Sequence, residues 1–241
     1  MDKRFLGILG ALVIIFVGIF AISQKSSTNN SNANSSNASQ ATKHVIGQGQ
    51  KGVTLIEYGD YECPICEAYY VPLKQAASQN STDIYFQFRN LPLTAIHQNA
   101  FAGARAAEAA GLQNKFWEMH DKLYENQSQW ANSSNPQTFF NSYAQAIGLN
   151  LNQFKTDYAS SKVNDAINAD LAEFNKTSQD KATPTFFLDG KYLSNSELVD
   201  SQGAPSVDKI TAVLKAEIAK KTTSATPSGS ATNASGSGSP Y

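Results

Sequence analysis

The sequence contains little cysteine and no excess of basic charge, and each shortage narrows the possible classes of protein. Its 241 residues include two cysteines, Cys63 and Cys66. A disulfide-stapled scaffold needs several bridges and a zinc ribbon needs two pairs of ligands, so both are excluded. The 19 Lys and Arg residues balance 20 Asp and Glu residues, with a formal net charge of -1. This balance argues against a nucleic-acid-binding protein, which would show a basic face or stripe.

An uncharged apolar run occupies residues 5–22, directly after Lys3 and Arg4. As a helix rising ~1.5 Å per residue, its 18 residues would reach about 27 Å, close to the ~30 Å hydrocarbon core of a bilayer. Because basic residues precede the run, we expect the N-terminus in the cytoplasm and the rest of the chain outside. We therefore predict an N-terminal membrane anchor at residues 1–23, with a cleaved signal peptide as the alternative.

Polar segments of low complexity flank one predicted domain. Residues 24–42 are rich in Ser and Asn and lack aromatic residues. Such a segment cannot bury enough apolar surface to offset the entropy of ordering, so we predict a disordered linker. Residues 222–241 have the same character and are predicted to be a disordered tail. The folded domain is expected to span residues 43–221.

Hydrophobic periodicity within this domain predicts an α/β fold. Short apolar runs indicate buried strands, and longer stretches with apolar residues at helical spacing indicate helices that cover them. The dipeptide Asp189-Gly190 is typical of a two-residue hairpin turn. The expected order is strand, helix, strand, helical block, hairpin and final helix. The strands are expected at residues 53–58 and 84–89, the hairpin at 185–193, and the final helix at 207–218.

The two cysteines form the motif Cys63-Pro64-Ile65-Cys66, which follows the first strand and opens a helix. Free N–H groups and the positive end of the helix dipole favour a thiolate at Cys63, and a thiolate is the nucleophile in thiol–disulfide exchange. Pro64 suits the first turn because it has no N–H to lose. Cys66, one turn along, is expected to be the resolving thiol. No Lys or Arg lies within seven residues of either cysteine, so a lowered pKa must come from the helix end and local hydrogen bonds.

Two other uses of a CxxC pair fit this sequence less well. A zinc half-site would need two further ligands, and His44, His97 and His120 are not at paired-ligand spacing. A purely structural bridge across so short a loop would remove little entropy from the unfolded chain. We therefore expect redox chemistry at Cys63 and Cys66, with no metal and no cofactor.

Three further residues outside the cysteine motif need an interpretation from the sequence. Glu57 lies in an apolar strand and is either a buried proton acceptor for Cys66, with its pKa raised by desolvation, or an edge residue that faces solvent. Pro184 follows Thr183 just before a strand, where a trans bond is the usual form. His120 lies on an apolar helical stripe, which indicates a hydrogen-bonded core histidine.

Three segments together resemble the bacterial DsbA-like thiol–disulfide oxidoreductases, especially the membrane-tethered members of Gram-positive and related bacteria. They are VTLIEYGDYECPIC, FRNLPLTAIHQNAFAGARAAEAAGLQNKFWEMHDKLYENQ and ATPTFFLDGK, and the resemblance covers about residues 45–221. It implies a thioredoxin fold with a helical insertion domain at about residues 95–181. It also implies that Glu57 is the buried glutamate of the family and that Pro184 is its cis-proline beside the active site.

The resemblance also implies catalytic residues, substrate contacts and partners. The catalytic residues would be Cys63, Cys66, Glu57 and Pro184, and the substrate contacts would be Pro64, Ile65 and Thr183. The substrates would be exported proteins with free or paired cysteines, and a quinone-linked membrane protein would reoxidise the enzyme.

The direction of the reaction is less constrained than the fold. Strongly oxidising members of the family often place His between the cysteines, whereas this chain has Pro64-Ile65. We expect an extracytoplasmic protein-disulfide oxidase anchored in the cell membrane by a single span. The alternatives are a reductase or isomerase, and a non-catalytic binding or chaperone domain that uses the groove around Pro184.

Overall fold

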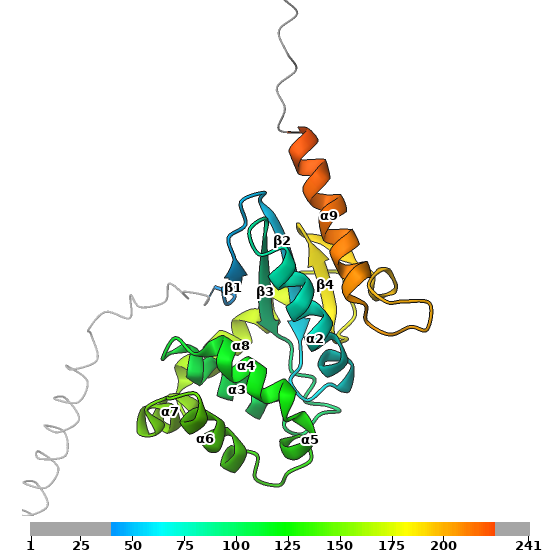
Figure 1. Ribbon diagram of the computed structural model, residues 1–241. Helices are drawn as coiled ribbons and strands as arrows, with labels where there is room; N and C mark the ends of the chain where they lie inside the picture. Colours follow the sequence, from blue (N-terminus) through cyan, green and yellow to red (C-terminus); the bar gives the residue numbers. More distant parts are fainter. Residues whose placement is uncertain (1–39, 225–241) are drawn as a thin grey trace, which may run out of the picture. The chain divides into compact units, whose positions relative to one another are not determined.

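The computed structural model describes residues 40–224 of the chain (Figure 1). The predicted membrane anchor at residues 1–23 lies outside the described residues, as do most of the predicted linker and tail. Within residues 40–224, no helix combines the length and the apolar character needed to cross a membrane.

A five-stranded mixed sheet forms the centre of the described domain. Its strands are β1 (His44–Gly47), β2 (Val53–Gly59), β3 (Ile84–Asn90), β4 (Thr185–Leu188) and β5 (Lys191–Leu193). Their order across the sheet is β1-β3-β2-β4-β5. The central pair β2 and β3 is parallel, and the remaining pairs are antiparallel. The predicted hairpin turn joins β4 to β5, and its residues Asp189 and Gly190 have positive φ angles of 49° and 77°.

Helices cover both faces of this sheet, which confirms the predicted α/β class. They are α2 (Pro64–Gln79), α3 (Ala100–Gly111), α4 (Phe116–Glu125), α5 (Gln127–Trp130), α6 (Gln137–Ala146), α7 (Leu151–Tyr158), α8 (Ser161–Phe174) and α9 (Val207–Ser224), with a 3-10 turn η1 (Asn195–Glu197). Helices α2 and α9 pack on one face, where Leu55 and Phe86 meet Leu73 and Leu214. On the other face, Phe174 of α8 packs with its neighbours from β2 and β4.

The helices from α3 to α8 lie between β3 and β4 in the sequence, inside the range 95–181 that the resemblance assigns to an insertion. They have their own core, in which Trp130, Phe140, Phe154 and Ile167 are fully buried. Helix α8 then returns to the sheet beside β3. The strand-to-helix turn that carries the cysteines is therefore bordered by a second, purely helical core.

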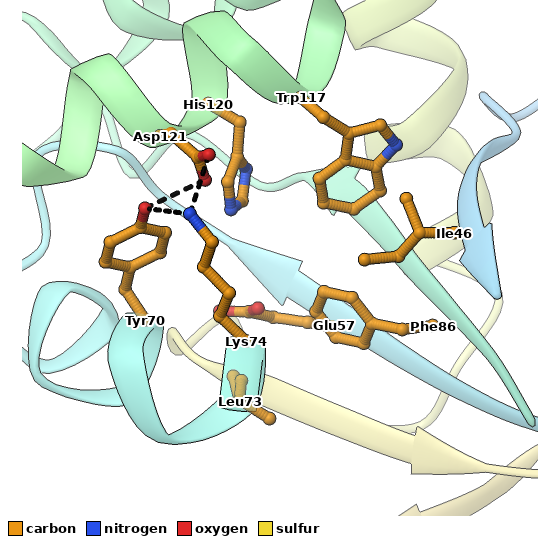
Figure 2. Close-up of a pocket in the computed structure, with 9 residues that line it drawn as sticks. All are labelled: Ile46, Glu57, Tyr70, Leu73, Lys74, Phe86, Trp117, His120 and Asp121. Atoms are coloured by element: carbon orange, nitrogen blue, oxygen red, sulfur yellow. Dashed lines mark hydrogen bonds and ion pairs between the residues drawn. The ribbon is translucent and has the colours of Figure 1, made fainter. Parts of the chain in front are cut away.

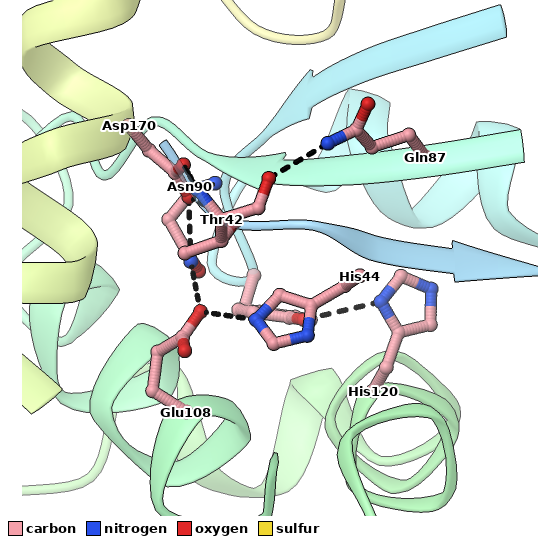
Figure 3. A network of polar contacts seen from close by, with 8 residues as sticks. Thr42, His44, Gln87, Asn90, Glu108, His120 and Asp170 are labelled. Atoms are coloured by element: carbon pink, nitrogen blue, oxygen red, sulfur yellow. Dashed lines mark hydrogen bonds and ion pairs between the residues drawn. The ribbon is translucent and has the colours of Figure 1, made fainter. Parts of the chain in front are cut away.

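A buried polar network ties the start of the domain to these helices (Figure 3). Asp170 of α8 accepts hydrogen bonds from the backbone N–H of Thr42 at 2.7 Å and from its hydroxyl at 2.8 Å. Glu108 of α3 pairs with His44 at 2.8 Å and accepts a bond from the side chain of Asn90 at 2.7 Å. Asn90 also donates to Asp170, so two buried carboxylates on different helices share one donor at the end of β3.

The structure differs from the predicted domain boundaries at both ends. Thr42, assigned to the linker from its composition, is bound to Asp170 and belongs to the domain. Strand β1 follows it and was not predicted, because only half of its four residues are turned inward and the apolar signal is short. Helix α9 continues through Ser224, so residues 222–224 of the predicted tail are helical.

Gly103 of α3 provides a test of this packing. A Cβ atom on Gly103 would lie 2.9 Å from Cη2 of Trp130 and 3.1 Å from Cβ of Tyr61. Gly to Ala normally stabilises a helix interior by about 1 kcal/mol, but overpacking a core costs about 1–3 kcal/mol. We expect Gly103→Ala to lower the free energy of unfolding, measured by urea denaturation. The control Gly111→Ala, where a Cβ meets its nearest neighbour at 3.4 Å, should be neutral or stabilising. Stabilisation by both substitutions would contradict the tight contact at Gly103.

Candidate active site

The two cysteines lie at the turn from β2 into α2 and in the first turn of that helix, at one end of the central strands. Cys63 is the N-cap of α2 with φ -71° and ψ 121°, and Pro64 occupies the first turn, as predicted. Cys63 is 5% exposed, whereas Cys66 is fully buried one turn further along the helix. Both are free thiols in the structure. Of the pair, only Cys63 can therefore meet a partner from outside the domain.

The environment of Cys63 favours its thiolate. Its pKa is lowered from 9.0 to about 6, chiefly because the Cys66 thiol donates a hydrogen bond to it. Burial acts in the opposite direction, whereas hydrogen bonding with Thr183 and with the backbone N–H groups of Cys66 and Ile65 lowers the pKa again. No cation is among these causes. The pKa of Cys63 is therefore lowered by hydrogen bonds at the start of the helix, as expected from the sequence.

Cys66 has the opposite tendency. Burial raises its pKa well above 9.0, and its hydrogen bond to Cys63 and the charge of Cys63 raise it further. A thiol that holds its proton this tightly donates to Cys63 and cannot attack until a base takes the proton. The two sulfurs therefore differ in how readily each one loses its proton.

Glu57 lies on the central strand β2, six residues before Cys63 in the chain. It is 2% exposed, which excludes the solvent-facing alternative left open by the sequence. Its pKa is raised from 4.5 to about 8, first by burial and then by the charge of Cys63. The atom Oε1 is buried and has no hydrogen-bond partner among the described residues. A carboxyl group in this setting is neutral at pH 7 and is able to give or take one proton close to that pH.

The loop before β4 forms the other side of the site. The Thr183-Pro184 peptide bond is cis, as the resemblance implied, and Pro184 is buried. The carbonyl oxygen of Thr183 lies 3.5 Å from Sγ of Cys63. The side chain of Asn195 donates a hydrogen bond to the Pro184 carbonyl at 3.1 Å and so links this loop to η1.

The three predicted substrate contacts surround the entrance to Cys63. Pro64 and Ile65 are exposed, with 54% of Ile65 accessible, and Thr183 is half-buried. A groove of about 420 Å³ begins at Ile65 and continues along Tyr69 to Val199 and Pro205. The structure therefore brings the predicted residues together around one sulfur and places an open apolar groove beside them.

Asp60 fixes the turn in place, a role that the sequence did not reveal. It is 1% exposed, and its carboxylate accepts hydrogen bonds from the backbone N–H groups of Glu62 at 2.8 Å and Leu93 at 2.9 Å. It also pairs with Nδ1 of His97 at 2.7 Å. In the sequence, Asp60 is one of the acidic residues close to the two cysteines. Its position directly after the Gly that ends a strand was the available signal for a turn-forming role.

Gln127 is a second residue that the sequence did not identify. It lies on α5, is buried, and donates through Nε2 to the carbonyl oxygens of Tyr61 at 2.9 Å and Cys63 at 3.0 Å. No local pattern marks such a residue, because its partners are more than sixty positions away in the chain. The insertion helices therefore help to hold the backbone of the cysteine turn.

His120 is a hydrogen-bonded core residue, as predicted. It is 4% exposed, and its Nδ1 lies 3.1 Å from the hydroxyl of Tyr61. Burial, followed by the charge of Lys74, lowers its pKa to about 3, so the ring is neutral. Within residues 40–224, no three or more His, Cys, Asp or Glu side chains are grouped so that they could hold a metal ion.

These features agree with the comparisons with known proteins. Residues 39–215 match the family described as thioredoxin, and the chain therefore belongs to the thioredoxin family. Oxidised BdbD from Bacillus subtilis is 21% identical with a TM-score of 0.61, covering 75% of this chain and 96% of that one. For α-DsbA1 from Wolbachia pipientis the identity is 16% and the TM-score 0.61, covering 76% and 94%. The resemblance to the DsbA-like proteins is confirmed in the fold.

Curated relatives match one part of longer proteins. One named Na(+)/H(+) antiporter NhaA 1 from Mycolicibacterium gilvum is 37% identical over 204 residues, which is 79% of this chain and 31% of that protein. Another of the same name from Mycolicibacterium vanbaalenii is 33% identical, covering 78% and 31%. The chain thus spans about a third of the length of these relatives.

The role of Cys66 in stabilising the Cys63 thiolate is directly testable. We expect the ultraviolet absorbance of the thiolate in the reduced protein to titrate with a midpoint of about 6. Cys66→Ala removes the largest favourable hydrogen bond and should raise the midpoint by one or more pH units, on the order of shifts caused by such bonds. Cys66→Ser keeps a donor and should raise it less. Equal midpoints in all three proteins would refute this account, and Cys63→Ser supplies the baseline.

Glu57 should make stability depend on pH in a defined direction. The folded protein keeps the Glu57 proton up to about pH 8, whereas the unfolded chain releases it near 4.5. The protonated Glu57 therefore makes its full contribution to the free energy of unfolding below about pH 4.5. This contribution is lost as the pH rises towards 8, by up to about 1.4 kcal/mol per pH unit. In urea unfolding of the reduced protein, the free energy of unfolding of Glu57→Gln should rise relative to that of the wild type between pH 5 and pH 8. Parallel stability profiles would contradict a buried, neutral Glu57.

Proposed function

We propose that this protein is a thiol–disulfide oxidoreductase that acts as an oxidase and donates the Cys63–Cys66 disulfide to other proteins. The observation that carries this proposal is the lowered pKa of Cys63, about 6. At pH 7 such a thiol is about nine-tenths ionised, whereas one with a pKa of 9.0 is about one per cent ionised. The reduced form is therefore favoured about tenfold, which makes the disulfide about 30 mV more oxidising.

The exchange proceeds in two balanced steps. A substrate thiolate attacks Sγ of Cys63, the bond between Cys63 and Cys66 breaks, and Cys66 leaves as a thiolate that takes the proton of Glu57. A second substrate thiolate then attacks the substrate sulfur of the mixed disulfide and displaces Cys63 as a thiolate. Two substrate thiols are oxidised to a disulfide, and the enzyme disulfide is reduced to a dithiol.

Glu57 is suited to act in both directions. The charge of the Cys63 thiolate is one of the two causes that raise its pKa. When Cys63 is bound in a mixed disulfide this charge is absent, and Glu57 ionises more readily. During reoxidation it can then take the proton of Cys66 at the stage when Cys66 must attack. The carboxyl thus responds to the covalent state of the neighbouring sulfur.

The substrates that fit this site are proteins with accessible cysteines. The groove that begins at Ile65 offers apolar surface from Tyr69 and Val199 beside the reactive sulfur. Pro64, Ile65 and Thr183 border the point at which a substrate sulfur must approach. An extended segment bound there would present its cysteine to Cys63.

We further propose that the domain is held outside the cell membrane by an N-terminal span, acts on exported proteins, and is reoxidised by a quinone-linked membrane protein. The apolar run at residues 5–22, with its preceding basic residues, supports this location. The polar segment at residues 24–42 is long enough to let a tethered domain reach substrates near the membrane.

The redox equilibrium of the protein with glutathione tests the proposed direction. We expect a potential less negative than about -200 mV, in the range of disulfide-donating proteins. A potential near -270 mV would overturn the oxidase assignment in favour of a reductase. The double variant Cys63→Ser, Cys66→Ser should lose all oxidation of a reduced test protein. If it retained the biological role of the wild type, the protein would instead be a non-catalytic binding domain.

A further inference from the structure

A cavity of about 100 Å³ lies between the sheet and helices α2 and α4, and neither cysteine lines it (Figure 2). Its walls include Leu73 and Trp117, and Glu57 lines it from strand β2. The cavity has room for several water molecules and offers them polar partners. Glu57 thus borders both the cavity and the end of β2, where a Cβ atom on Gly59 would lie 3.2 Å from its Oε1.

A cluster of three residues, Tyr70, Lys74 and Asp121, lines the same cavity (Figure 2). The ammonium group of Lys74 donates to Oδ2 of Asp121 at 2.7 Å and to the hydroxyl of Tyr70 at 3.0 Å. It also lies 5.2 Å from the centre of the Tyr70 ring. The Tyr70 hydroxyl in turn donates to Oδ1 of Asp121 at 2.8 Å. Lys74 therefore has three contacts that hold its charge in this cluster, with its side chain half-exposed.

Lys74 is the one cation among the described residues that line this cavity. A cation brought to the Glu57 carboxylate would favour its ionised form, against the effects of burial and of Cys63. An ionised Glu57 has no proton to give to the Cys66 thiolate. The position of Lys74 thus bears on the step in which the disulfide opens.

We propose that Asp121 and Tyr70 are positioning residues that hold the Lys74 ammonium away from Glu57, so that Glu57 keeps its proton until Cys66 requires it. This inference rests on the proposed function, because it concerns the proton that disulfide opening consumes. The proton passes from Glu57 to the Cys66 thiolate, and bulk solvent returns a proton to Glu57 by way of the cavity, which the half-exposed Lys74 also lines. Lys74 takes no part in this proton transfer.

Other titratable groups also face Glu57 and enter its electrostatics. They are Cys63, Cys66, Tyr69, Tyr70 and Lys74 on α2 or its cap, His120, Asp121 and Tyr124 on α4, and Tyr61 in the cysteine turn. His120 is neutral, and burial keeps the tyrosines protonated. Besides the Cys63 thiolate, Lys74 and Asp121 are thus the oppositely charged pair that lines the cavity together with Glu57.

A carbon-13 NMR titration of the Glu57 carboxyl in the reduced full chain tests this inference. The signal is assigned by its loss in Glu57→Gln. We expect a midpoint of about 8 in the wild type and a fall of about one unit or more in Asp121→Asn, as a freed Lys74 approaches Glu57. The matched control Glu125→Gln removes the other carboxylate that contacts Tyr70, at 3.4 Å, and leaves the Lys74–Asp121 pair intact. It should move the midpoint by less than half as much.

The double variant Asp121→Asn, Lys74→Gln separates a moved lysine from the simple loss of a negative charge. We expect its midpoint to return to the wild-type value or above. An unchanged midpoint in Asp121→Asn, an equal fall in Glu125→Gln, or a fall that persists without Lys74 would each overturn the inference. If Asp121→Asn fails to fold, Tyr70→Phe carries the test, with a smaller fall in the same direction. The titration is readable whatever the redox potential, so its failure is distinct from failure of the oxidase proposal.

Discussion

The carboxylate of Asp60 holds the turn on which both sulfurs depend. This buried group accepts two backbone N–H bonds and pairs with His97, so the chain leaves β2 and enters α2 in one fixed path. Cys63 then falls at the cap of the helix, where its thiolate meets local N–H groups, and Cys66 falls inside the core. Without that constraint, neither the hydrogen bond between the sulfurs nor the contact with Thr183 would have a defined geometry.

Two buried carboxylates three positions apart, Asp60 and Glu57, differ in their hydrogen bonding. Asp60 has its hydrogen bonds satisfied by the turn that it organises. Glu57 has an oxygen with no partner among the described residues, and burial followed by the charge of Cys63 raises its pKa. A satisfied carboxylate stabilises a shape, whereas an unsatisfied one remains available for a proton. In the proposed function, Asp60 therefore stabilises the turn and Glu57 exchanges a proton with Cys66.

The helical insertion contributes side chains that contact the cysteine turn and line the cavity beside Glu57. Gln127 binds the backbone of the cysteine turn, and α4 contributes His120 and Asp121 to the cavity beside Glu57. The network around Glu108 and Asp170 joins these helices to the start of the domain. The sheet supplies the position of the sulfurs, and the insertion supplies the polar contacts that set their surroundings.

Local patterns in the sequence were enough to predict the α/β class, the helix that begins at Cys63, the hairpin at Asp189-Gly190 and the core position of His120. Each depends on residues close together in the chain, whose periodicity or turn chemistry acts over a few positions. Whether Glu57 faces solvent or the core was not decided locally, because the alternation of a strand does not say which strand is central.

Only the tertiary structure decided what surrounds the sulfurs. The partners of Asp60, the donor Gln127 and the cluster of Tyr70, Lys74 and Asp121 join residues separated by up to 66 positions in the chain. Hydrogen bonds and charges act through space over a few ångströms, and their strength depends on burial that a linear pattern does not encode. The sequence therefore determined which titratable groups are present at the cysteine motif, and the fold determined their protonation.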